Sequence, residues 1–153
     1  MNTFKIMSDL LKLVKKNKTH RYRYGISDDY IYLLADGDRF IKIPKDDFLI
    51  DLTKALPKCT PLNNPDNLLK DDEYTLAYKT DDLKVIEGPK RTLVKIANRD
   101  AHAWVNIDYL KDFNDDCTFK IYGPKNPVFI YENDIKVGLV LPFFVKEDRD
   151  DKI

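Results

Sequence analysis

Residues 30–43 read YIYLLADGDRFIKI and contain the clearest structural signal in the chain. Two runs rich in aromatic, aliphatic and β-branched residues, Tyr30–Ala35 and Arg39–Ile43, flank the triplet Asp36-Gly37-Asp38. An Asp-Gly pair between two such runs is a strong signal for a tight turn that joins antiparallel strands. The stretch therefore predicts a β-hairpin, and we expect one more strand, Tyr22–Ile26, before it.

Helices are predicted on both sides of this group of strands. Met7–Asn17 has apolar residues on one face, and Ser8 is the expected N-cap. In Asp46–Leu56 the apolar residues recur every four positions, and Pro57 ends the pattern. We therefore expect a second helix followed by a loop, so that residues 45–73 form an insertion.

The rest of the chain reads mostly as short strands, with one short helix, Ile107–Phe113, for which Asn106 is the expected cap. We expect a single domain over residues 1–145 and a charged, flexible tail over residues 146–153. The remaining predicted strands are Tyr74–Tyr78, Leu83–Ile86, Leu93–Ala97, Ala101–Val105, Thr118–Tyr122, Val128–Tyr131 and Lys136–Leu141.

Both ends of the chain follow the same predicted order, one helix and then three strands. We therefore predict an α+β fold with two pseudo-symmetric halves, in each of which one helix packs on an antiparallel sheet. No residue-level repeat accompanies this order, and many α+β proteins alternate in a similar way by chance. Both interpretations stay open on the sequence alone.

The composition excludes several classes of protein. The chain has 153 residues, no net formal charge and no apolar run of the roughly 18 residues that a membrane span needs. Phosphate-binding glycine loops and HExxH metal motifs are absent from the sequence. The two cysteines and the two histidines lie far apart, and neither cysteine has a base nearby in sequence that would make it catalytic. We therefore expect a soluble, cytoplasmic protein that is not an enzyme and needs no membrane, metal or cofactor.

Pairs of aspartates are the one feature that points toward catalysis, because carboxylate pairs hold Mg²⁺ in nucleases. Nearly all of these pairs fall in predicted turns or helix starts, where Asp forms local hydrogen bonds with the backbone. A metal-dependent nuclease is therefore the least supported of the functional hypotheses. The pairs are Asp28-Asp29, Asp46-Asp47, Asp71-Asp72, Asp81-Asp82 and Asp115-Asp116.

Residues 12–23 carry six cationic side chains and no acidic one. A basic helix followed by a basic strand could face the phosphates of duplex DNA, since each neutralised phosphate releases counterions. A solvated face balanced by acids elsewhere explains the same charges, because the net charge of the chain is zero. The candidate DNA-binding residues are Lys12, Lys15, Lys16, Lys18, Arg21 and Arg23.

Four segments together resemble bacterial sliding clamps, the β subunits of the replicative DNA polymerase. Residues 34–40, LADGDRF, are similar to the clamp signature ATDGHRL. Residues 105–112, VNIDYLKD, resemble the helix start FNxxYLxD near the end of a clamp chain. Residues 123–130, GPKNPVFI, and residues 139–143, LVLPF, resemble the loop and strands that close it. Residues 45–99 match the family poorly.

The resemblance implies a non-catalytic ring component of DNA replication. Clamps enclose duplex DNA with helices that line a basic hole, and their sheets join edge to edge between domains. Six copies of a single-domain chain would be needed to close such a ring, so the resemblance implies a homo-oligomer. It also implies that replication proteins bind through short peptides in a composite pocket. The pocket positions would be Gly37, Asp38, Arg39 and Phe40 of one copy with Leu141, Pro142 and Phe143 of a neighbouring copy.

The last predicted helix departs from the clamp pattern. Asp108, Asp112 and the pair Asp115-Asp116 surround a single Lys111, and these carboxylates would repel phosphates. An alternative is therefore a clamp-fold adaptor or inhibitor, encoded by a phage or mobile element, that binds a replication protein without encircling DNA.

Overall fold

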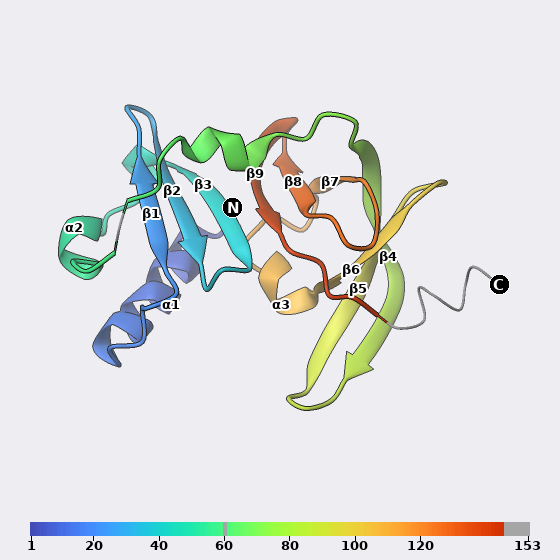
Figure 1. Cartoon of the computed structure of the whole chain (residues 1–153), viewed down its shortest axis with the longest axis horizontal. Coiled ribbons are helices and arrows are strands. Elements are labelled where there is room, and N and C mark those ends of the chain that lie inside the picture. The colour runs from blue at the N-terminus through green and yellow to red at the C-terminus, as the bar shows by residue number, and fades with distance from the viewer. Residues whose placement is uncertain (60, 146–153) are drawn as a thin grey trace.

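The chain folds into one large antiparallel sheet with few helices, a mixed α/β arrangement (Figure 1). The computed structural model describes residues 1–59 and 61–145, so the expected charged tail, residues 146–153, lies outside the described residues. In the described part of the chain, nine strands follow the order β1-β2-β3-β9-β8-β7-β4-β5-β6. Their bounds are β1 Arg23–Ile26, β2 Tyr30–Ala35, β3 Arg39–Pro44, β4 Thr75–Ile86, β5 Arg91–Ala97, β6 His102–Asn106, β7 Thr118–Ile121, β8 Val128–Glu132 and β9 Ile135–Val140.

The hairpin predicted from residues 30–43 is confirmed. β2 and β3 pair antiparallel, with Ala35 opposite Arg39. Asp36 and Gly37 both have positive φ, 56° and 77°, and the Asp38 N–H donates to the Ala35 carbonyl oxygen at 3.2 Å. Positive φ at both central residues gives the turn a twist that matches the twist of the flanking strands. The Asp-Gly pair therefore sets the register of β2 against β3.

The first three strands and the last three strands meet where β3 pairs with β9. Phe40 lies opposite Leu139, and Ile41 lies opposite Gly138. A Cβ atom at Gly138 would lie 2.3 Å from the carbonyl oxygen of Phe40, so position 138 of β9 has room only for glycine. The first three strands and the last three thereby form one continuous run, β1-β2-β3-β9-β8-β7.

The first helix, α1 Thr3–Lys15, begins earlier than predicted. Its N-cap is Asn2 rather than Ser8, since the Asn2 side chain accepts the N–H of Lys5 at 3.2 Å. The backbone N–H of Asn2 also donates to the carbonyl oxygen of Asp112 at 2.8 Å. A tertiary contact thus decides between two residues that are both good N-caps.

The last helix, α3 Ile107–Leu110, is a single turn rather than the longer helix predicted. Asn106 caps it as expected, by accepting the Asp108 N–H at 3.0 Å. Leu10 from α1 and Leu110 from α3 belong to one core cluster with residues from both ends of the sheet. Both helices therefore pack into the same core.

The continuous helix predicted over Asp46–Leu56 is wrong. The segment forms a 3₁₀ turn, η1 Lys45–Asp47, and a separate helical turn, α2 Leu52–Ala55. The residue after η1 is extended, and the Asp51 side chain caps α2. The apolar spacing reflects burial rather than a helix, since the residues four positions apart all lie in the core: Phe48, Leu52 and Leu56.

One strand, β4, replaces two predicted strands. Its pairing with β5 becomes irregular between Lys79 and Leu83, and the Asp81-Asp82 pair lies inside this irregularity. Before β4, the predicted insertion (residues 45–73) contains a second 3₁₀ segment, η2 Pro65–Leu69. Its last residue packs with Phe40 and Phe129 in a smaller cluster.

No helix in the described ranges is long and apolar enough to cross a membrane.

Candidate functional site

All six cationic residues of the basic run predicted as the DNA-binding element are exposed. The exposed members are Lys12, Lys15, Lys16, Lys18, Arg21 and Arg23. The first two lie in the last turns of α1, and the last opens β1. Arg21 has an acidic neighbour, because its Nε lies 3.4 Å from Asp36 Oδ1 with both side chains about half exposed. The run therefore presents cationic groups to solvent, where an anionic partner can reach them.

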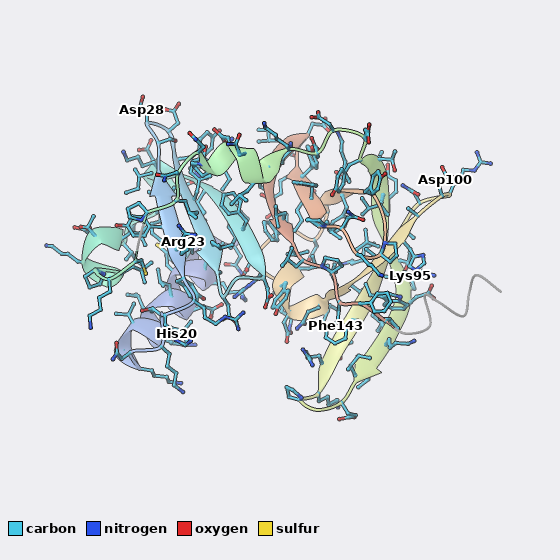
Figure 2. All side chains as sticks on the ribbon, in the orientation of Figure 1. His20, Arg23, Asp28, Lys95, Asp100 and Phe143 are labelled. Atoms are coloured by element: carbon cyan, nitrogen blue, oxygen red, sulfur yellow. The ribbon has the colours of Figure 1, made fainter. Side chains whose placement is uncertain are left out.

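A second stretch without acids lies beside the first. Residues 10–27 and residues 52–65 contain lysines or arginines but no Asp or Glu. The fold brings the two together, because His20 and Arg23 of the first line the same cavity as Lys54 and Lys58 of the second. Figure 2 shows His20 and Arg23 at the β1 end of the sheet, on the side of α1 and α2. The two lysines fall outside the predicted run, and the lack of acids around them is the signal that could have found them.

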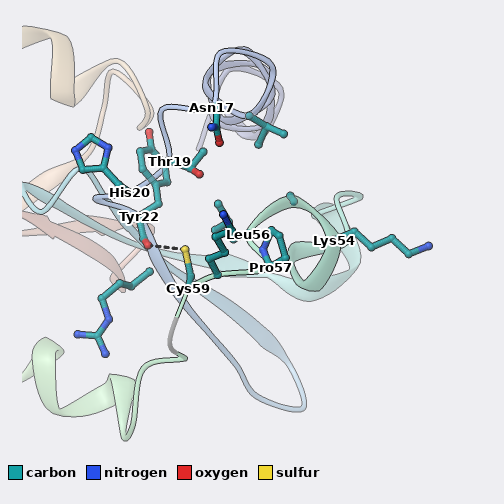
Figure 3. Close-up of a pocket in the computed structure, with 12 residues that line it drawn as sticks. Asn17, Thr19, His20, Tyr22, Lys54, Leu56, Pro57 and Cys59 are labelled. Atoms are coloured by element: carbon teal, nitrogen blue, oxygen red, sulfur yellow. Dashed lines mark hydrogen bonds between the residues drawn. The ribbon is translucent and has the colours of Figure 1, made fainter.

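The cavity between these stretches has a volume of about 790 Å³ (Figure 3). Part of its apolar lining comes from Val14 near the end of α1 and from Leu56 after α2. The Cys59 thiol donates to the Tyr22 carbonyl oxygen at 3.0 Å and so ties the loop after α2 to the start of β1. Burial raises the pKa of Cys59, although the positive charge of Arg23 opposes this shift. The thiol is therefore a neutral lining group at neutral pH.

The two main motifs of the clamp resemblance meet in the interior. Nη1 of Arg39 donates to Asp112 Oδ2 at 2.9 Å, and the guanidinium carbon lies 5.0 Å from the centre of the Tyr109 ring. The Tyr109 hydroxyl donates to Asp38 Oδ2 at 3.0 Å. Asp38 and Arg39 belong to the first motif, whereas Tyr109 and Asp112 belong to the second. Burial raises the pKa of Tyr109, and the neighbouring Asp38 carboxylate raises it further.

Asp112 also joins α1 to this contact. Nζ of Lys5 lies 2.7 Å from Asp112 Oδ1 and 2.8 Å from Asp9 Oδ2. Burial alone would lower the pKa of Lys5, but the hydrogen bonds and charges of Asp112 and Asp9 outweigh it, so that the pKa is raised. The ammonium group therefore stays charged and pairs with Asp112.

The expectation that Asp112 repels phosphates is wrong. Its side chain is 1% exposed, and both carboxylate oxygens are paired with cations, Lys5 and Arg39. Asp108 does lie on the surface, where it pairs with Lys111 at 2.9 Å. A buried, neutralised carboxylate contributes little to the surface potential, so the acidity of this segment is smaller than the sequence indicates.

The two groups of residues expected to form a partner-peptide pocket lie side by side in one chain. The Leu141 N–H donates to the Asp38 carbonyl oxygen at 2.9 Å, next to the β3–β9 pairing. A neighbouring copy is therefore not needed to bring the groups together. Their aromatic side chains lie in different clusters, since Phe40 is buried against Tyr32, whereas Phe143 packs near Trp104. The members are Gly37, Asp38, Arg39, Phe40, Leu141, Pro142 and Phe143.

Comparisons with known proteins do not identify a relative. No family model, no curated protein and no solved structure matches this chain. In residues 1–59 and 61–145, no group of three or more His, Cys, Asp or Glu side chains is arranged to hold a metal ion. The function is therefore inferred from the chain's own residues.

Proposed function

We propose that this chain is a non-catalytic, sliding-clamp-like protein of DNA replication that binds duplex DNA through its basic surface. The contact between Arg39 and Asp112 carries the proposal, because it joins the two motifs that resemble those of clamps. These residues lie 73 positions apart in the chain. If each motif resembled its clamp counterpart only by chance, we would not expect an ion pair with a buried carboxylate to join the two.

The order of elements supports a clamp-like pair of related halves. The runs α1-β1-β2-β3 and α3-β7-β8-β9 have the same order, and they meet where β3 pairs antiparallel with β9. A twofold axis between two such halves requires this antiparallel pairing of their last strands. Because α3 has only four residues, α1 would supply most of the helical surface that faces DNA.

The distribution of charge supports DNA as the partner. The chain has no net charge, yet residues 10–27 and 52–65 contain no Asp or Glu, and Arg23 of the first stretch lines the same cavity as Lys54 and Lys58 of the second. Lysines and arginines that neutralise phosphates release the counterions condensed on duplex DNA. The gain in free energy from this release needs no base-specific contact, as expected for a protein that moves along DNA.

Equilibrium binding of the chain to duplex DNA at increasing salt tests the proposal. We expect log K to fall linearly with log salt, with a slope of about −0.9 for each phosphate neutralised. Absence of binding, or binding that does not weaken with salt, would remove the DNA-binding role.

A second candidate function is an adaptor or inhibitor that keeps the clamp-like fold without encircling DNA. Both edge strands of the sheet already accept a hydrogen bond from their own chain. The Leu62 N–H donates to the Tyr24 carbonyl oxygen in β1, and the Phe143 N–H donates to the Trp104 carbonyl oxygen in β6, each at 2.7 Å. Such contacts would have to open before these edges could pair with other copies in a ring.

The mass of the protein in solution distinguishes the two candidates. A closed hexamer favours the ring, whereas a monomer or dimer favours the adaptor. For the adaptor, a pull-down with purified replication proteins should recover a partner, and recovery of none would count against it.

A further inference from the structure

We infer that the cavity between residues 10–27 and 52–65 binds a nucleoside phosphate. The phosphate lies at the cationic rim, and the base lies against the apolar lining. This inference rests on the proposed DNA-binding surface, but it names a ligand that an intact duplex does not present. The source is either a free nucleotide or an unpaired nucleotide of a DNA strand, because bases stacked inside a duplex cannot reach a cavity lining.

The charge around the cavity favours an anionic ligand. Among the described residues, its lining includes the cations Arg23, Lys54 and Lys58 and no carboxylate. Arginine and lysine side chains form charge-assisted hydrogen bonds with phosphate oxygens. Figure 3 shows the Lys54 side chain extending outward from α2, away from the other labelled lining residues. Its flexible stem allows the ammonium group to turn toward a phosphate that arrives from solvent.

The size and lining of the cavity favour a ligand with an apolar part. A volume of about 790 Å³ lies in the range of small-molecule sites. Apolar surface comes from Val14, Ala55 and Pro57, against which a base can pack. Asn17 and Thr19 line the same cavity and offer an amide and a hydroxyl group. Both can exchange hydrogen bonds with the edge of a base or with the sugar.

Isothermal titration calorimetry tests the inference with three probes: deoxyadenosine triphosphate, a 5′-phosphorylated single-stranded oligonucleotide, and a blunt duplex. The test variant is the double substitution Lys54→Ala/Lys58→Ala. The matched control is Lys70→Ala/Lys90→Ala, which removes two other exposed lysines and the same net charge. We expect the test variant to bind the nucleotide or the single strand about tenfold more weakly than the wild type, and the control to bind them as the wild type does.

The outcomes separate the sources of the ligand and separate this inference from the proposed function. Binding of the triphosphate indicates a free nucleotide, and binding of the single strand alone indicates an unpaired nucleotide. If neither probe binds, or if both variants lose affinity equally, the inference is wrong whatever the duplex does. If the duplex does not bind but a nucleotide does, the proposed DNA-binding function is wrong, whereas the inferred nucleotide site in the cavity is supported.

Cys59 provides a second readout that needs no substitution. Its thiol lines the cavity, whereas Cys117, the other free cysteine, is not among the lining residues and serves as an internal reference. Burial raises the pKa of Cys117 to about 11, so its reaction is slow. We expect saturating ligand to slow alkylation of Cys59 about fivefold without changing the rate at Cys117. An unchanged rate at Cys59 would overturn the inference.

Discussion

Arg39 and Asp112 form an ion pair in the interior, with Nη1 2.9 Å from Oδ2, although they lie 73 residues apart in the chain. Arg39 stands at the start of β3, and Asp112 follows α3. The second oxygen of Asp112 pairs with Lys5 of α1. One carboxylate therefore links α1, the β2–β3 hairpin and the segment that follows α3.

Asp112→Ala should destabilise the protein by about 2–3 kcal/mol. The substitution leaves Arg39 without its buried partner, and breaking a buried pair from one side is costly. Lys5 keeps Asp9 and some contact with water, which moderates the loss. Urea unfolding measures the effect. The control Asp108→Ala removes an exposed pair and should change stability by less than about 0.5 kcal/mol. Similar small losses for both variants would show that the Asp112 contact does not stabilise the fold.

Gly138→Ala should destabilise the pairing of β3 with β9. The new Cβ would lie 2.3 Å from the Phe40 carbonyl oxygen and 3.2 Å from Cζ of Phe113. Because a strand backbone cannot move away cheaply, we expect a loss of about 2–3 kcal/mol in the free energy of unfolding. Gly123→Ala is the control, since its nearest neighbour would be an asparagine side chain at 3.4 Å. The control should stay within about 1 kcal/mol of the wild type. If Gly138→Ala is as stable as the wild type, β9 does not pair with β3 at the close distance that Gly138 requires.

Because of Asp71, part of the free energy of unfolding depends on pH in the acidic range. Burial alone would raise the pKa of Asp71, but the hydrogen bonds from Lys136 and Tyr131 and the charges of Lys136 and Lys120 hold it below 3.8. The unfolded state therefore binds a proton more readily than the folded state does. The stabilising contribution is present above pH 3.8 and is lost as the pH falls through the lower, folded pKa.

Asp71→Asn should remove this pH dependence. The difference in unfolding free energy between the wild type and the variant should be largest near neutral pH and should shrink in acid, as measured by urea unfolding over a pH series. Asp72→Asn, at the exposed neighbouring position, controls for the change in net charge. A difference between wild type and Asp71→Asn that stays constant from neutral to acidic pH would contradict the role of Lys136 and Tyr131.

Apart from β4, the strands of this chain are predictable because their signals are local. The Asp36-Gly37 turn and the two runs beside it are enough to predict one hairpin from the local sequence. Burial is also predictable, as Phe48, Leu52 and Leu56 show, although the backbone between them is not helical. Apolar spacing reports which side chains face the core, and a short segment can satisfy it without forming a helix.

The contacts of the candidate site are not predictable in the same way, because they depend on tertiary packing. Lys54 joins the basic surface only because the insertion folds back against β1, where the Cys59 thiol bonds to Tyr22. Asp112 reads as a surface charge in the sequence, yet the fold surrounds it with Lys5 and Arg39. Charge patterns in a sequence give the sign of each residue but not the partner that neutralises it.

Duplex DNA binding by the wild type and by Lys12→Ala/Lys15→Ala/Lys16→Ala over a range of salt concentrations tests the DNA-binding role most directly. Lys70→Ala/Lys79→Ala/Lys90→Ala removes three exposed lysines elsewhere and serves as the control. We predict a steep salt dependence for the wild type and the control, and a slope about 0.9 shallower for each phosphate contact that the first variant loses. No binding by the wild type, or the same slope for all three proteins, would contradict the claim that this basic surface faces DNA.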